Sequence, residues 1–102
     1  MTVCNEKVKE AIEQELQAAL DKHGPYHSDA ERYAVMLEEL EEAQDELVQA
    51  RRELQRMWLQ IRGNNPKLAD ECAARVGYNA EKLAREACQL AATARKAVAR
   101  HG

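Results

Sequence analysis

Apolar side chains recur along residues 33–61 in alternating steps of four and three residues. The series consists of Tyr33, Leu37, Leu40, Gln44, Leu47, Arg51, Leu54, Trp58 and Ile61, with Gln44 and Arg51 as polar interruptions. This spacing places all nine side chains on one stripe of an α-helix and is the repeat of coiled coils and helix bundles. It predicts one long helix whose stripe is either the core of a bundle or the contact surface of a dimer.

Helix boundaries follow from the residues that interrupt this kind of periodicity. A first helix is expected over residues 5–23, because Gly24-Pro25 cannot continue it. The long helix is expected over residues 29–62, capped by Ser28 or Asp29, with Glu31 at the capping-box distance from Ser28.

Two shorter helices are expected in the remainder of the chain. Gly63-Asn64-Asn65-Pro66 is a strong stop signal, and Pro66 suits the first turn of a helix over residues 66–76. Gly77-Tyr78 is expected to interrupt the helical pattern after that helix, and Asn79 is expected to cap a last helix over residues 79–100. The prediction is a single all-α domain over residues 1–102, with about four helices and one long central helix.

Composition supports this fold class and narrows the functions. The chain has 102 residues, no Phe, four Gly and two Pro, which is the bias of a helical protein. A net charge of −3 gives no reason to expect binding to a nucleic-acid duplex, and no apolar run is long enough for a membrane span. Three scattered cysteines and an N-terminus without an apolar run predict a cytoplasmic protein.

Six acidic residues crowd into the nine positions from Glu38 to Glu46. Their mutual repulsion is offset either by water and salt on a solvated face or by a divalent cation. Glu39 and Glu42, three residues apart, can chelate one hard cation from a single helix, and Glu38 with Glu42 is a second pairing. Charge runs of this kind are usually solvated faces.

A metal site in a helix bundle also needs ligands from a facing helix. The last predicted helix offers Glu86, followed by Gln89 three residues later. Glu86 lies on the flank of the face that carries Leu83 and Leu90. The alternative for Glu86 is an ordinary surface residue.

Four segments of the sequence form a recognisable set: Lys22 to Ser28 (KHGPYHS), Tyr33 to Val35, Leu37 to Glu42 (LEELEE) and Arg85 to Ala92 (REACQLAA). Together they resemble a phage and bacterial branch of the MazG-like family of all-α nucleoside triphosphate pyrophosphohydrolases. The family signature is EExxE on one helix and ExxD on a later one. This chain has the first half and carries Gln89 where the signature has Asp. The spacing between the halves is longer than usual, and Ser28-Asp29-Ala30-Glu31 lacks the His that the branch often has.

The resemblance implies a four-helix arrangement, assembled as a homodimer or homotetramer, that hydrolyses an NTP or dNTP to monophosphate and pyrophosphate. Glu39, Glu42, Glu86 and Gln89 would hold Mg²⁺, with Mn²⁺ as a substitute, and Glu38 would orient or deprotonate the attacking water. A cation is also needed for the pyrophosphate. Lys96 is the first candidate and Arg95 the second; the alternative for both is a surface charge near a helix C-terminus.

Two other classes of function stay open at this stage. One is a catalytically lapsed MazG-like oligomer that serves as a structural or partner-binding module, and Gln89 and the long stripe favour it. The other is a plain antiparallel coiled coil without a site. Gly-rich phosphate loops of the GxxxxGK[ST] or GxGxxG type do not occur in the sequence. His23 and His27 are separated by Gly24-Pro25 and are interpreted as turn or surface residues.

Overall fold

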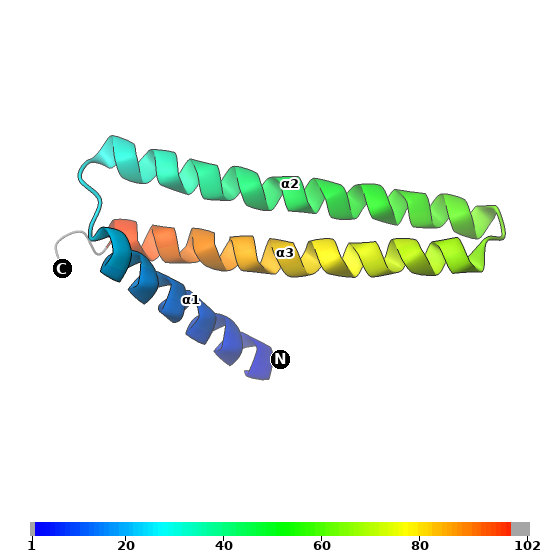
Figure 1. The fold of residues 1–102 in the computed structure, drawn as a ribbon, viewed down its shortest axis with the longest axis horizontal. Helices are drawn as coiled ribbons and strands as arrows, with labels where there is room; N and C mark the ends of the chain where they lie inside the picture. The colour runs from blue at the N-terminus through cyan, green and yellow to red at the C-terminus, as the bar shows by residue number, and fades with distance from the viewer. Residues whose placement is uncertain (1, 99–102) are drawn as a thin grey trace. The chain divides into compact units, whose positions relative to one another are not determined.

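The computed structural model describes residues 2–98, which form three α-helices: α1 (Thr2–His23), α2 (Asp29–Arg62) and α3 (Pro66–Val98) (Figure 1). The predicted all-α class is confirmed, and this part of the chain contains no strand. None of the three helices combines the length and the hydropathy that crossing a bilayer requires. The end of the predicted 79–100 helix, including Arg100, lies outside the described residues.

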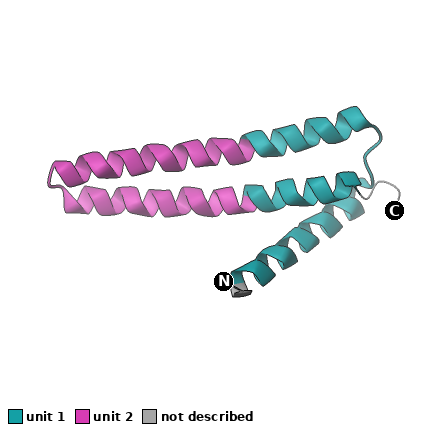
Figure 2. Ribbon diagram, turned by 180° about the vertical axis from the view of Figure 1, so that it is seen from behind, with its two compact units in different colours: residues 1–41, 86–102 teal, residues 42–85 magenta. Residues whose placement is uncertain are grey.

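The chain, predicted as a single domain, groups into two compact units, which Figure 2 distinguishes by colour. Unit 1 consists of residues 1–41 and 86–102, and unit 2 consists of residues 42–85. Unit 1 therefore contains α1, the first part of α2 and the last part of α3. Unit 2 is a helical hairpin made of the rest of α2, a short turn and the rest of α3.

In unit 1, local hydrogen bonds fix the connection between α1 and α2. Gly24 has a φ of 67° and its N–H donates to the carbonyl of Leu20 at 2.8 Å, which closes α1 in the left-handed conformation that glycine favours. Ser28 Oγ then accepts from the N–H of Glu31 at 3.0 Å, and Glu31 Oε1 accepts from the N–H of His27 at 3.3 Å. The predicted capping arrangement at the start of α2 is thus present.

In unit 2, the turn between α2 and α3 follows the stop signal in the sequence. Asn64, rather than Gly63, takes the left-handed conformation, with a φ of 59°. The N–H of Asn65 donates to the carbonyl of Gln60 at 2.9 Å and that of Asn64 to Ile61 at 3.1 Å, which is the Schellman pattern. Pro66 begins α3, where its missing N–H costs nothing.

The predicted break at Gly77 is absent: α3 is continuous where two helices, 66–76 and 79–100, were expected. A glycine inside a helix weakens it by about 0.5–1 kcal/mol but does not end it unless the chain adopts another conformation there. The φ of Gly77 is not positive. Asn79, expected as a cap, instead donates from Nδ2 to Glu46 Oε2 at 3.4 Å, a contact that favours the continuous helix.

The apolar stripe of α2, defined by the nine residues from Tyr33 to Ile61 in the 4-3 series, faces solvent. Leu54 is 57% exposed and Trp58 is 58% exposed. The described buried residues of α2 are Ala43 and Glu53, on a different face. The interpretation of the stripe as the core of this chain's own bundle is therefore wrong. In unit 2 the helices approach through small side chains instead, namely Ala43, Ala69 and Cys72.

Ion pairs complete the packing of unit 2. Glu53, which is only 7% exposed, accepts from Arg75 Nε at 2.9 Å and from Arg56 Nη1 at 2.6 Å. The hydrogen bond from Arg75 holds the pKa of Glu53 below its ordinary value, against the opposing effect of burial. Glu46 Oε1 lies 3.1 Å from Lys82 Nζ, and this hydrogen bond raises the pKa of Lys82. These carboxylates are therefore matched by cations inside their own unit.

Candidate functional site

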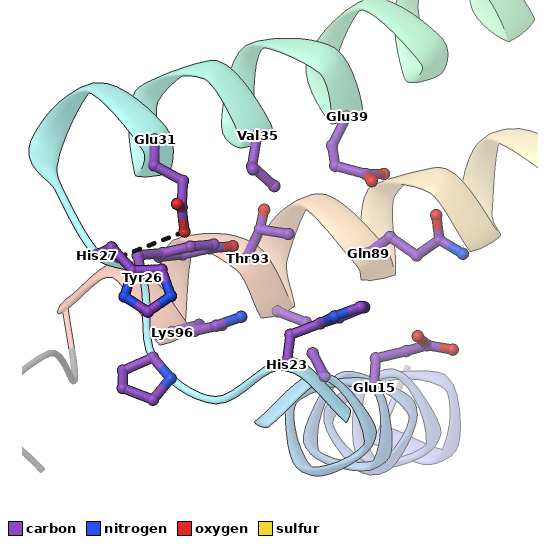
Figure 3. Close-up of a pocket in the computed structure, with 13 residues that line it drawn as sticks. Glu15, His23, Tyr26, His27, Glu31, Val35, Glu39, Gln89, Thr93 and Lys96 are labelled. Carbon is purple, nitrogen blue, oxygen red and sulfur yellow. Dashed lines mark hydrogen bonds between the residues drawn. The ribbon is translucent and has the colours of Figure 1, made fainter. Parts of the chain in front are cut away.

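Unit 1 contains a cavity of about 540 Å³ among α1, the connecting loop, α2 and α3 (Figure 3). This volume falls within the range of small-molecule sites, about 300–1,000 Å³. The residues that line it are Glu15, Ala19, His23, Pro25, Tyr26, His27, Glu31, Val35, Glu39, Gln89, Ala92, Thr93 and Lys96. Two of the sequence-predicted site residues on α3, Gln89 and Lys96, therefore share this cavity with Glu39 of α2.

At one end of the cavity, the buried Lys96 contacts the half-buried Tyr26. Lys96 is 5% exposed, and its Nζ lies 4.2 Å from the centre of the Tyr26 ring. Such a cation–π contact partly replaces the water that a buried ammonium loses. Burial raises the pKa of Tyr26, and the charges of Glu31 and Glu39 raise it further. The phenol therefore stays protonated and can donate a hydrogen bond.

The loop that carries Tyr26 is held by the elements on either side. Gly24 turns the chain out of α1, and the capping hydrogen bonds of Ser28 and Glu31 start α2 at Asp29, five residues later. Glu31 lines the cavity as well as capping the helix. On the α3 side, Arg32 Nη1 donates to the carbonyl of Ala97 at 2.8 Å, which ties the first turn of α2 to the last turn of α3. These contacts fix the cavity wall.

Two carboxylates of unit 1 meet beside the cavity. Glu39 from α2 and Glu86 from α3 each have a carboxylate oxygen within 4.8 Å of one on the other. Glu42, three residues after Glu39 along α2, belongs to unit 2. Carboxylate oxygens are the ligands that Mg²⁺ and Ca²⁺ prefer, so these residue types suit a hard divalent cation.

Gln89 lies between Glu39 and Glu86. With the amide oriented so that its nitrogen faces the carboxylates, Gln89 Nε2 donates to Glu39 Oε2 at 3.1 Å and to Glu86 Oε2 at 3.3 Å. Figure 3 shows Glu39 extending from α2 and Gln89 from α3 toward the same space. In this orientation the amide bridges two negative groups, whereas coordination of a metal through its oxygen requires the amide to turn over.

The remaining two predicted site residues lie elsewhere. Glu38 is exposed, one residue and about 100° around α2 from Glu39. Arg95 is on the α1 side of α3, where its Nη1 pairs with Glu13 Oε2 at 3.0 Å. Among the described residues, neither Glu38 nor Arg95 lines the cavity. The structure therefore offers Lys96, and not Arg95, as the cation of this cavity.

The cavity residues that were not predicted as site residues include four with polar side chains, His23, Tyr26, Glu31 and Thr93. Three of them, His23, Tyr26 and Glu31, belong to the KHGPYHS turn or cap the helix that follows it. These residues were interpreted as marking a helix boundary and a family resemblance, and not a binding site. Tyr26 has no helical periodicity, so its packing against Lys96, 70 positions later, depends on the folded arrangement of unit 1. Thr93 lies one turn before Lys96 and donates its hydroxyl to the carbonyl of Leu90 at 2.8 Å.

Comparison of the chain with protein-family models, with curated proteins and with solved structures finds no match.

Proposed function

We propose that this protein is a Mg²⁺-dependent nucleotide pyrophosphohydrolase that converts an NTP or dNTP to the monophosphate and pyrophosphate, as the resemblance to the MazG-like family implies. The observation that carries the proposal is the meeting of Glu39 and Glu86 beside a cavity that contains a buried lysine. A triphosphate needs divalent charge and a cation near its phosphates. We also propose that the protein acts in the cytoplasm as a homodimer or homotetramer.

In this proposal Glu39, Glu42 and Glu86 hold Mg²⁺, and Mn²⁺ can replace it. A bound cation of this kind neutralises phosphate charge and lowers the pKa of coordinated water. Gln89 either turns its amide oxygen toward the cation or keeps its amide nitrogen on Glu39 and Glu86 and so positions them. Glu38 remains the proposed group that orients or deprotonates the attacking water, on the strength of the resemblance.

The residues of the cavity suit a nucleotide. Lys96 lies two turns beyond Gln89, about 10 Å along α3, and provides a positive charge for the phosphates. Because Lys96 is buried, its attraction for an anion is less screened than that of a surface lysine. The Tyr26 hydroxyl is kept protonated and is a donor for a phosphate or sugar oxygen. Apolar wall residues such as Val35 and Ala92 offer contacts to uncharged parts of the substrate.

The direct test is incubation of the purified protein with each NTP and dNTP in Mg²⁺ or Mn²⁺, with quantification of monophosphate and pyrophosphate. We expect equimolar monophosphate and pyrophosphate from at least one substrate, and abolition by EDTA. A double variant, Glu39→Gln with Glu86→Gln, controls for contaminating hydrolases. Equal activity of this variant, or no turnover of any nucleotide at high protein concentration, would overturn the proposal.

A second candidate function is a catalytically lapsed relative that retains the fold as a partner-binding module. The amide of Gln89 favours it, because donation to Glu39 and Glu86 satisfies these carboxylates without a metal. The two candidates differ in a binding measurement. The enzyme is expected to gain thermal stability on addition of Mg²⁺, whereas the lapsed relative melts at the same temperature with and without it.

A further inference from the structure

The ammonium group of Lys96 is held against an aromatic ring and not against a carboxylate. Lys96 is 5% exposed, and its Nζ lies 4.2 Å from the centre of the Tyr26 ring. Within residues 2–98, Lys96 forms no salt bridge with a carboxylate. A buried lysine without such a partner is uncommon, because burying a charge is costly unless a partner offsets the lost hydration. Its positive charge therefore stays available to a ligand of the cavity.

A carboxylate suited to pair with Lys96 lies on the other side of the same ring. Figure 3 shows the Tyr26 ring between the carboxylate of Glu31 and the side chain of Lys96. Burial raises the pKa of Tyr26, and so does the negative charge of Glu31, which agrees with a short distance between that carboxylate and the phenol. Glu31 Oε1 also accepts from the N–H of His27 at 3.3 Å, so the carboxylate is tied to the start of α2.

The backbone on both sides restricts where the Tyr26 ring can go. Gly24 closes α1 with its N–H on the carbonyl of Leu20, and Ser28 caps α2 through the N–H of Glu31. Three residues remain between these two fixed points, and the first of them, Pro25, has a restricted φ. The ring is therefore positioned by two helix ends and not by a flexible loop.

We propose that Tyr26 is a positioning residue whose ring keeps Lys96 apart from Glu31, so that the Lys96 charge is free to bind a phosphate group. A lysine against a neutral ring remains a net positive charge, whereas a lysine paired with a glutamate is a neutral pair with little attraction for an anion. The inference rests on the proposed function for the identity of the ligand. It assigns the effect to the face of the ring, which is separate from hydrogen bonding by the Tyr26 hydroxyl.

The inference is tested by calorimetric measurement of pyrophosphate binding in the presence of Mg²⁺. Tyr26→Phe removes the hydroxyl and keeps the ring, whereas Tyr26→Leu removes both. We expect Tyr26→Leu to bind pyrophosphate about tenfold more weakly than Tyr26→Phe. Because the ring acts through the ammonium, Tyr26→Leu is expected to have no further effect in a Lys96→Met background. The matched control is Tyr78→Leu, which removes a ring from Lys82 outside the cavity and should leave binding unchanged.

A rescue experiment separates this role from a purely structural one. Glu31→Gln keeps a side chain that can cap α2 but cannot form an ion pair with Lys96. Combined with Tyr26→Leu, it is expected to restore affinity for pyrophosphate to that of Tyr26→Phe, and thermal melting checks that each variant folds. Equal affinities of the Tyr26→Leu and Tyr26→Phe proteins, absence of rescue, or a wild type that does not bind pyrophosphate would overturn the inference. Wild-type protein that binds pyrophosphate but hydrolyses no nucleotide would overturn the proposed function alone.

Discussion

The two compact units use buried or half-buried glutamates in different ways. In unit 2, Glu53 is matched by Arg75 and Arg56, and Glu46 by Lys82, so each carboxylate has a cation within hydrogen-bond distance. In unit 1, Glu39 and Glu86 lie near each other, and the group between them is the neutral amide of Gln89. In unit 2 these glutamates pair with cations, whereas in unit 1 two carboxylates and an amide meet beside a cavity.

Under the proposed function, this difference separates a structural role from a binding role. A carboxylate held by two guanidinium groups stabilises the packing of helices and has little capacity left for a ligand. Two carboxylates held near each other repel, and a divalent cation relieves that repulsion. Under the proposed function, two glutamates of the same helix, α2, serve different purposes: Glu39 binds metal and Glu53 stabilises the packing.

The largest expected effect is on hydrolysis when a carboxylate of unit 1 is neutralised. Glu39→Gln removes a charged ligand while preserving size, so we expect kcat/KM to fall by about 100-fold or more. The matched variant in unit 2, Glu53→Gln, is expected to leave kcat/KM within about threefold at a temperature where it is folded. Steady-state assays with added Mg²⁺ make the measurement. Equal losses of activity in the two variants would contradict the comparison.

A second experiment sharpens the assignment within unit 1 by comparing two neighbouring cations of α3. Lys96→Met removes the buried charge of the cavity, and loss of one charge-assisted contact of about 1.5–3 kcal/mol predicts a rise in KM of about 10-fold or more. Arg95→Met removes a charge that pairs with Glu13 outside the cavity, and little change in KM is expected. The Michaelis constants of both variants and of Lys96→Arg decide the matter. A larger effect at Arg95 would restore it as the phosphate-binding residue.

Much of the fold follows from local signals in the sequence. The bounds of α2 and both of its flanking turns are set by residues within a few positions of the boundary, such as Gly24, Ser28 and Asn64. The proximity of Glu39 and Glu86 was also expected. That expectation came from the two-part signature of the MazG-like family, which the sequence resembles, and not from helical periodicity. That these residues bind metal remains a proposal.

Other features depended on tertiary packing and were mispredicted or missed. The 4-3 series identified the apolar stripe of α2 but did not show which face of α2 contacts α3. In unit 2, α3 packs on the face of α2 that contains Ala43 and Glu53, and not on the stripe. A buried Glu53 is favourable only because Arg75, 22 positions later, is brought to it. The contact between Tyr26 and Lys96 likewise joins a loop to a distant helix. Single-sequence patterns carry no signal for such pairings.

The pH dependence of stability tests the structural role of Glu53. Its pKa in the folded protein is below the ordinary value of 4.5, so the unfolded state binds more protons as the pH falls through this region. The stabilisation from Glu53 is therefore fully present above about pH 4.5 and is lost as the pH falls through the lower, folded pKa. We expect the Tm of the wild-type protein to fall when the pH is lowered below this point. The Glu53→Gln variant should have a lower Tm at neutral pH and should lose less of it on acidification. Parallel curves for the two proteins would show that Glu53 contributes no such stability.

The smallest expected effect compares a glycine of each unit. Gly77 lies inside continuous α3 with open space at the position of a Cβ, whereas Gly24 has a φ of +67°. Gly77→Ala should therefore stabilise the protein by about 0.5–1 kcal/mol, through helix propensity and a less flexible unfolded chain. Gly24→Ala should destabilise it by about 1–2 kcal/mol, because a Cβ is strained in the left-handed region. Urea denaturation gives both values. Destabilisation by Gly77→Ala would mean that α3 breaks at this residue in solution, as the sequence pattern alone predicts.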